Sequence, residues 1–346
     1  MSEVKRHKTH KKANISDVAK KAGVSIKTVS RFLNQEKYIR EETKEKVISA
    51  IKALNYSPNV QARGLRGERS YMIGLFVDDL SGDYISKVQR GILSGCEKEG
   101  SHLVVEVLSE RGSAAKVRDL LSCVRFDGVV LTPPVCDDMA VLNALRDAAI
   151  PVVRLGAGIP VPDMALAEID DYQAARDMTD YLISLGHHSI GFIKGDPSHG
   201  SAHERERGYI HALQAAGIAV KSELIVQGMF CHSGGREAAA TLLALDPRPT
   251  AIFSSNDEMA IGAMASIDAQ GMKIPDDISI VGFDDHVMSQ IVLPPLTTIH
   301  QPIEQMATEA VSLLGKVTKQ DKSMLQTRIF LEYDLKVRKS AAPLSC

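Results

Sequence analysis

The chain has 346 residues, of which 44% are hydrophobic and 24% charged, a composition typical of globular proteins with two or three domains. No run approaches the about 18 apolar residues of a membrane-spanning helix, and the basic N-terminus lacks the apolar stretch of a signal peptide, so we expect a cytoplasmic protein. Five cysteines without a Cys-x-x-Cys pair favour neither a disulfide framework nor a metal site.

The charges are distributed unevenly along the chain. Residues 1–69 contain 17 Lys and Arg against 7 Asp and Glu, whereas the remaining 277 residues contain 24 against 36. The net charges of +10 and −12 predict that only the N-terminal part binds a polyanion such as nucleic acid. Its first stretch, residues 1–13, is strongly basic, and we expect it to be a disordered arm.

Residues 14–56 show the pattern of three short helices. Gly23 ends the first helix, and Ser25 can cap a second helix over residues 26–33. A third helix, at about 41–54, has apolar residues at helical spacing that can close a small core. Two short helices joined by so tight a glycine turn predict a helix-turn-helix DNA-binding domain.

The second of these helices has polar and exposed positions that the small core does not need. In a helix-turn-helix its N-terminal end enters the major groove, where Lys27 can donate to guanine and Ile26 can contact a thymine methyl group. Hydroxyl groups and backbone amides can hold phosphates. The residues that we expect to contact DNA from this helix are Ile26, Lys27, Thr28, Ser30 and Arg31. A three-helix module that binds protein remains an alternative.

Residues 57–69 form a linker between the two oppositely charged parts. Ser57 can cap a helix, Pro58 suits its first position and Gly67 can end it, but the run is shorter than the about 12–15 residues that an isolated helix needs in water. Its order therefore requires a partner. With three arginines in the stretch, that partner is a nucleic-acid groove, unless the segment is a flexible basic linker.

Two motifs carry a resemblance to a known family. The pattern DVAxxAGVSxxTVSR at 17–31 and the pattern YSPNxxARxL at 56–65 resemble the head and hinge of the LacI/GalR family of bacterial transcriptional regulators. The resemblance implies that residues 26 and 27 read an operator, and that two hinge helices pair across a homodimer. It also implies that Leu65 enters the minor groove, with Asn59 and Arg63 as further DNA contacts. Arg40 departs from the family, which usually has Ser or Thr as the cap of the third helix.

Residues 70–346 alternate between apolar runs and helical patterns, which predicts an α/β fold with parallel sheets flanked by helices. Two such series predict two lobes, at about 70–170 and 171–298, each completed by part of the C-terminal region, with a ligand in the cleft between them. The expected strands are 72–77, 103–108, 128–131, 152–155, 190–193, 224–227, 251–253, 278–283 and 329–337. The expected helices are about 84–99, 112–123, 138–148, 203–216, 234–245, 257–270 and 303–316.

Polar residues gather where the second series of strands ends. Asp257 and Asp285 are interpreted as caps of helices and loops, whereas Arg205 and Asp284 are interpreted as ligand contacts. An arginine fork and a carboxylate can each bind neighbouring sugar hydroxyls, and an aromatic ring can cover the apolar side of a pyranose. Asp171 is expected to end a further strand. The composition of these strand ends therefore suits a carbohydrate.

The same region resembles the effector-binding core of the LacI/GalR family, which is similar to periplasmic sugar-binding proteins. The patterns that carry this resemblance are RxxGY at 205–209, NDxMAxG at 256–262, and VGFDD at 281–285 with PLTT at 295–298. The resemblance implies a two-lobed core that grips a small effector. The residues that it assigns to the effector are Arg205, Asn256 and Asp284, with Phe230 as the stacking aromatic and His199, Ser201 and Tyr84 as further contacts.

Enzyme signatures are absent from the sequence: there is no GxGxxG after a strand, no GxxxxGK[ST], no HExxH and no GxSxG. We therefore expect no catalytic residues, no cofactor and no metal. The sequence indicates a DNA-binding transcriptional regulator, a homodimeric repressor relieved by a small effector, with a sugar favoured. The alternatives are a soluble sugar-binding protein or sugar enzyme with an unrelated head, and a corepressor-dependent regulator with a non-sugar effector.

Overall fold

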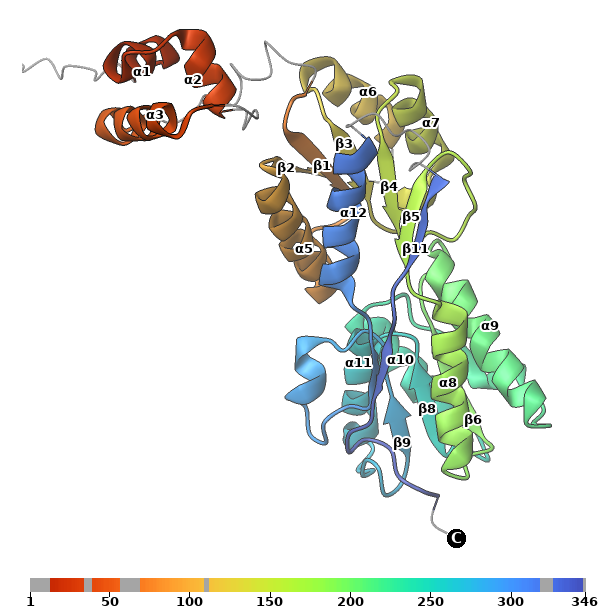
Figure 1. Cartoon of the computed structure of the whole chain (residues 1–346). Coiled ribbons are helices and arrows are strands. Elements are labelled where there is room, and N and C mark those ends of the chain that lie inside the picture. The colour runs from red at the N-terminus through yellow and green to blue at the C-terminus, as the bar shows by residue number, and fades with distance from the viewer. Residues whose placement is uncertain (1–12, 34–38, 57–68, 109–111, 318–325, 345–346) are drawn as a thin grey trace, which may run out of the picture. The chain divides into compact units, whose positions relative to one another are not determined.

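The computed structural model describes residues 13–33, 39–56, 69–108, 112–317 and 326–344. The chain divides into two compact units, Met1–Ser70 and Tyr71–Cys346 (Figure 1). Most of the predicted arm and the predicted hinge helix, with Asn59, Arg63 and Leu65, lie outside the described residues. No helix in the described part of the chain is both long and apolar enough to cross a membrane.

The first unit contains the three predicted helices α1 (Ile15–Ala22), α2 (Ile26–Leu33) and α3 (Glu41–Leu54). A capping box between Asn14 and Asp17 starts α1, and Gly23 ends it with a φ of 67°, which glycine adopts without strain. The helices close around a small core of Val18, Ala19, Ala22, Val29, Val47 and Ala50. This arrangement confirms the helix-turn-helix prediction. Arg40 precedes α3 without a side-chain capping bond, as expected from its departure from Ser or Thr.

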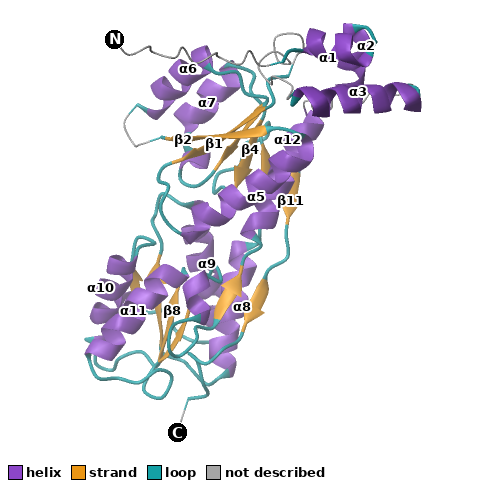
Figure 2. Cartoon of the chain, turned by 90° about the vertical axis from the view of Figure 1, so that its left-hand side faces the viewer, coloured by secondary structure: helices purple, strands orange, loops and turns teal. Residues whose placement is uncertain are grey.

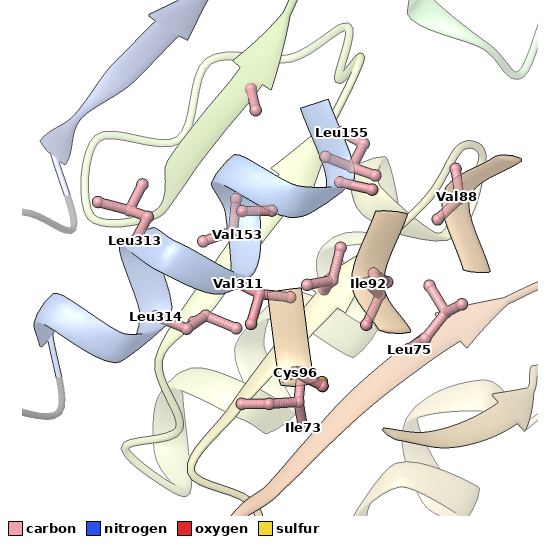
Figure 3. Packing of buried hydrophobic residues seen from close by; sticks show 14 of the residues in the cluster. Ile73, Leu75, Val88, Ile92, Cys96, Val153, Leu155, Val311, Leu313 and Leu314 are labelled. Atoms are coloured by element: carbon pink, nitrogen blue, oxygen red, sulfur yellow. The ribbon is translucent and has the colours of Figure 1, made fainter. Parts of the chain in front are cut away.

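The first lobe of the second unit is a parallel sheet of six strands in the order β11-β5-β4-β3-β1-β2. Helices α5 (Asp83–Glu99) and α12 (Ile303–Val317) pack on one face, where Val88, Ile92 and Val311 meet strand residues such as Leu75 and Val153 (Figure 3). Helices α6 (Ser113–Cys123) and α7 (Met139–Asp147), with the short η1 (Val135–Asp137), belong to the core on the other face. The strands are β1 (Met72–Val77), β2 (His102–Val107), β3 (Gly128–Leu131), β4 (Val152–Leu155), β5 (Ala165–Glu168) and β11 (Arg328–Phe330).

The second lobe is a parallel sheet in the order β7-β6-β8-β9. Helices α8 (Asp171–Ser184) and α9 (Gly200–Ala215) pack on one face, where the ring of Phe192 stacks on that of Tyr209 with centroids 4.7 Å apart. Helices α10 (His232–Leu243) and α11 (Asp257–Ala269) pack on the other. The strands are β6 (Ile190–Lys194), β7 (Ile225–Gln227), β8 (Ala251–Ser254) and β9 (Ser279–Val281), and the short turns are η2 (Ser222–Leu224) and η3 (Val287–Gln290).

The chain passes between the lobes at three places: from β5 to α8, from β10 (Thr298–His300) to α12, and from β11 to β12 (Asp334–Lys336). The passage that leaves β11 can be followed in Figure 2. The predicted strand at 329–337 is therefore wrong as a single element. Its first part pairs with β5 in the first lobe, and its last part pairs antiparallel with β10 beside the second. Asp171 does not end a strand but begins α8, a helix that was not predicted from the sequence.

A buried histidine ties the end of the described chain to the second lobe. His187 is 2% exposed, and its ring nitrogens bond the Thr250 hydroxyl and the Ala342 carbonyl at 3.0 and 3.1 Å. Burial lowers the pKa of His187 below its usual value of 6.5. A neutral ring fits both bonds when Nε2 donates to the carbonyl and Nδ1 accepts from the Thr250 hydroxyl, for which the Ser189 carbonyl at 3.2 Å is the competing acceptor.

We predict that this histidine makes stability depend on pH. Below pH 6.5 the unfolded chain binds a proton that the folded chain resists, so the free energy of unfolding falls as pH drops, by at most about 1.4 kcal/mol per pH unit. Urea unfolding between pH 7.5 and 5 measures this slope. His187→Gln should make the slope shallower, and an identical slope in both proteins would contradict the assignment.

Candidate functional site

The outward face of α2 carries residues that have no packing role in the small core. Ile26 is 42% exposed, and Lys27 beside it is exposed as well. Thr28 is held by Ser25, whose hydroxyl bonds the Thr28 hydroxyl at 2.9 Å and accepts from its backbone N–H at 3.1 Å. The predicted contacts Ser30 and Arg31 are half-buried on the same helix. The N-terminal end of α2 thus presents one apolar and one cationic side chain.

A cavity of about 410 Å³ lies between the two lobes of the second unit. Its walls come from segments that follow the carboxyl ends of strands in both sheets, including β1, β4, β5, β6, β8 and β9. All seven predicted effector residues line it: Tyr84, His199, Ser201, Arg205, Phe230, Asn256 and Asp284. The structure therefore brings together residues that lie up to two hundred positions apart in the sequence.

Arg205 lies at the wall of the cavity and is largely bound by the protein itself. Its Nε donates to Asp171 at 2.8 Å, and its Nη1 donates to the Ser255 carbonyl at 2.5 Å and lies 3.7 Å from Asp284 Oδ1. Its guanidinium carbon lies 3.6 Å from the centroid of the Phe283 ring. Among its nitrogens, Nη2 alone has no bond to a described residue. Of the guanidinium nitrogens that were predicted to bind a ligand together, Nη2 is thus the one that can still donate to it.

Asp284 faces Arg205 in the cavity from the loop after β9. Its Oδ1 accepts from Gln301 Nε2 at 2.5 Å, while no described residue bonds its Oδ2. Burial raises the pKa of Asp284, and the nearby Arg205 opposes that rise. An acceptor oxygen next to a guanidinium donor is an arrangement that suits neighbouring hydroxyl groups.

Phe230 is held in the cavity wall through its backbone carbonyl, which the Asn256 side chain binds, and through its ring, which lies on Gly195. Asn256 donates from Nδ2 to the Phe230 carbonyl at 3.2 Å, and its Oδ1 caps α11 by accepting from Met259 N at 2.9 Å. The ring covers Gly195 so closely that a Cβ there would lie 2.0 Å from it. The His199 ring meets the Phe230 ring edge-on at 5.2 Å, and burial lowers the pKa of His199. Asn256 therefore positions the aromatic ring as well as lining the cavity.

Asp257 and Asp285 make structural contacts, although the cap of α11 is Asn256 and not Asp257. Asp257 is fully buried and accepts from the Thr298 hydroxyl at 2.6 Å and from His286 N at 2.7 Å. Asp285 pairs with Arg338 at 2.5 Å and with His300 at 3.1 Å. Neither residue lines the cavity.

Several cavity residues were not predicted from the sequence as ligand contacts: Asp78, Asp79, Asp83, Asp171, Asp196, Glu258 and Gln301. Asp78 directly follows β1, so the strand-end rule that found Asp284 also applies to it. Gln301 has no such signal, because the passage of the chain from β10 to α12 is what brings it to the cavity.

Two contacts join the lobes beside the cavity. Lys87 on α5 donates to the carbonyls of Asp284 and Asp285 at 3.4 and 2.9 Å and pairs with Asp83 at 2.7 Å. In the second contact Gly158 and Gly200 pack backbone to backbone, since a Cβ on Gly200 would lie 1.9 Å from the Gly158 Cα. The loop that carries Asp284 is thus tied to the other lobe.

We expect Lys87→Met to lower the free energy of unfolding by about 1.5–3 kcal/mol, because it removes charged hydrogen bonds from a side chain that is only 14% exposed. The matched control is Lys116→Met, which removes a similar lysine bonded to Val107 and Glu106 within one lobe and 51% exposed. That control should cost less than about 1 kcal/mol. If denaturant unfolding shows the same loss of unfolding free energy in both variants, the contact between the lobes contributes no more to stability than the contact within one lobe.

Comparison with known proteins identifies both units. Residues 14–59 match the family model "Bacterial regulatory proteins, lacI family", and residues 179–341 match the model "Periplasmic binding protein-like domain". The HTH-type transcriptional regulator DegA of Bacillus subtilis (strain 168) is 33% identical to this chain, over 96% of this chain and 99% of DegA.

Two solved structures are similar over nearly the whole chain. The lac repressor dimer bound to operator and the anti-inducer ONPF has a TM-score of 0.80 at 30% identity, covering 96% of this chain and all of that one. The complex of the transcriptional regulator CelR with cellobiose has a TM-score of 0.74 at 29% identity, covering 95% of this chain and all of that one.

Proposed function

Since the chain belongs to the LacI family of bacterial DNA-binding transcriptional regulators, we propose that it is a homodimeric repressor that leaves its operator when a carbohydrate occupies the cavity. The observation that carries the proposal is the cavity in which Arg205, Asp284 and Phe230 meet between two lobes. It lies in a chain whose other unit is a basic helix-turn-helix domain.

In this proposal α2 reads the operator. Ile26 contacts a thymine methyl and Lys27 a guanine, while Thr28, Ser30 and Arg31 hold phosphates. Support comes from the exposure of Ile26 and Lys27 at the helix end that a helix-turn-helix inserts into the major groove. From the sequence alone, Asn59, Arg63 and Leu65 bind the centre of the site, with Leu65 as an apolar wedge.

The effector in this proposal is bound from both lobes. Arg205 Nη2 and Asp284 Oδ2 bind hydroxyl groups, and Phe230 covers an apolar face of the sugar. His199, Ser201 and Tyr84 add contacts, and Asn256 holds Phe230 in place. The cellobiose complex of the related CelR supports a carbohydrate as the class of effector.

The mechanism couples the cavity to the head through the relative position of the lobes. A ligand that contacts both lobes favours one spacing of them, because only differential binding shifts such an equilibrium. The tie from Lys87 to the Asp284 loop and the packing of Gly158 on Gly200 are the contacts that such a shift changes. The expected change in operator binding is about 1–3 kcal/mol, the usual range of allosteric coupling.

The proposal is tested in two steps with the full-length protein. A thermal-shift screen against a carbohydrate panel should find a ligand that raises the melting temperature, because it binds only the folded state. Binding to operator duplexes selected from random DNA should weaken steeply with log salt concentration. A flat salt response would favour a sugar-binding protein or enzyme, and tighter operator binding with the ligand would favour a corepressor.

A further inference from the structure

The cavity wall is strongly acidic. Seven carboxylates line it, whereas Arg205 is the one Arg or Lys among its described lining residues. The carboxylates are Asp78, Asp79, Asp83, Asp171, Asp196, Glu258 and Asp284. The two histidines of the wall do not balance this charge. Burial lowers the pKa of His199, and His286 Nδ1 accepts from Met288 N at 2.9 Å, as the nitrogen of a neutral ring does.

The single arginine is not available to bind an anion in the usual two-pronged way. Its Nε and Nη1 already donate to Asp171 and the Ser255 carbonyl, and Asp284 lies next to it. A phosphate or carboxylate is recognised best by a guanidinium that offers two parallel N–H donors. Arg205 offers Nη2 alone, between two carboxylates. A neutral hydroxyl group can be bound by this single N–H donor.

The carboxylates of the wall differ in whether a cation pairs with them. Asp83 pairs with Lys87 at 2.7 Å, and Asp171 and Asp284 share Arg205. No described cation pairs with Asp78, Asp79 or Glu258. The Asp79 carboxylate is held by Ser81 and the Leu80 backbone N–H, whereas the Asp78 carboxylate accepts from the backbone N–H groups of Asp78 and Asp79. Asp78 is thus a carboxylate of the wall that has no ion-pair partner among the described residues and is contributed by the first lobe, where burial raises its pKa.

We propose that the effector carries no negative group: it is an uncharged carbohydrate or one with a protonated amine, and sugar phosphates and uronic acids are excluded. Asp78 is the residue that sets this preference, because no described Lys or Arg pairs with its carboxylate, which therefore repels an anion in the cavity. The inference rests on the proposed function, since it concerns the ligand of the same site.

Matched sets of probes test the inference. Glucose, glucosamine, glucose 6-phosphate and glucuronic acid, the corresponding galactose series, and cellobiose are titrated against the full-length protein by calorimetry and thermal shift. The expected result is that an uncharged or amine-bearing member binds at least tenfold more tightly than the phosphate and the uronic acid of its own series. A phosphate or uronic acid that binds more tightly than its parent sugar would overturn the inference.

Two variants distinguish the effect of a charge in the cavity wall from the effect of the net charge of the protein. Asp78→Asn should reduce the preference for the uncharged sugar over its phosphate at least threefold, whereas Asp268→Asn, which removes an exposed charge outside the cavity wall, should leave the ratio unchanged. Equal effects of the two variants would contradict the role of Asp78.

The same probes distinguish the two proposals from each other. An anionic sugar that binds and releases the operator would overturn this inference and leave the repressor function standing. An uncharged sugar that binds without changing operator affinity would support the inference and contradict the repressor function. Failure of these probes and of every member of the carbohydrate panel to bind would overturn both.

Discussion

Lys27→Ala is expected to weaken operator binding by about 1–3 kcal/mol for each half-site, and by twice that for a symmetric dimer that presents the residue to both. The reason is that Lys27 is exposed at the N-terminal end of α2, where a side chain can donate to the acceptor edge of guanine. The loss should be largest for the preferred operator and small for random DNA. Fluorescence anisotropy with both duplexes measures it.

Lys46→Ala is the matched control, since it removes the same charge from the same unit. Lys46 pairs with Glu42 on α3 at 2.7 Å, and it has no place on the reading face. We expect this variant to change the affinities for both duplexes alike and only slightly. If the two variants lose operator affinity equally, Lys27 acts only as a positive charge and the assignment of the reading helix is wrong.

Asp284→Asn is expected to weaken carbohydrate binding at least tenfold and to keep operator binding, so that repression continues in the presence of the sugar. Hydrogen bonds to a charged acceptor contribute about 1.5–3 kcal/mol, and Asp284 Oδ2 is free for such a bond. Asparagine is preferred to alanine because residue 284 has a φ of 112°, which asparagine tolerates better than alanine does. Calorimetry and operator binding measure the two effects separately.

The neighbouring carboxylate gives the contrasting result. Asp285→Asn breaks the pair with Arg338, both side chains of which are largely buried, and should cost about 3–5 kcal/mol of unfolding free energy. The sugar affinity of the folded protein should change little, because Asp285 does not line the cavity. The reverse pattern in the two variants would mean that their roles have been exchanged.

Local patterns were sufficient to predict most of the elements. The glycine turn at Gly23 and the helical spacing of apolar residues predicted α1, α2 and α3, and buried runs such as β3 and β4 were predicted at their observed bounds. These signals lie within a few residues of one another, so tertiary contacts are not needed to find them.

The sequence could not predict the contacts that arise where the chain crosses from one lobe to the other. The run 329–337 alternates like one strand, but residues 331–333 connect a strand of one sheet to a strand of another. No local sequence pattern indicates that the chain changes sheets there. In the cavity, residue types identified Arg205 and Asp284 as candidates. That Asp171 and Ser255 already occupy two nitrogens of Arg205 depends on the packing of α8 and α9 against β8, which sequence spacing does not reveal.

The most direct test of the account is the affinity for the selected operator with and without a saturating concentration of the carbohydrate that stabilises the protein most. We predict that the dissociation constant rises about 5- to 150-fold with the sugar in the wild-type protein, and that it rises less in Asp284→Asn, whose cavity is less occupied at the same sugar concentration. An unchanged dissociation constant in the wild-type protein, with the cavity shown by calorimetry to be filled, would contradict the claim that the cavity controls DNA binding.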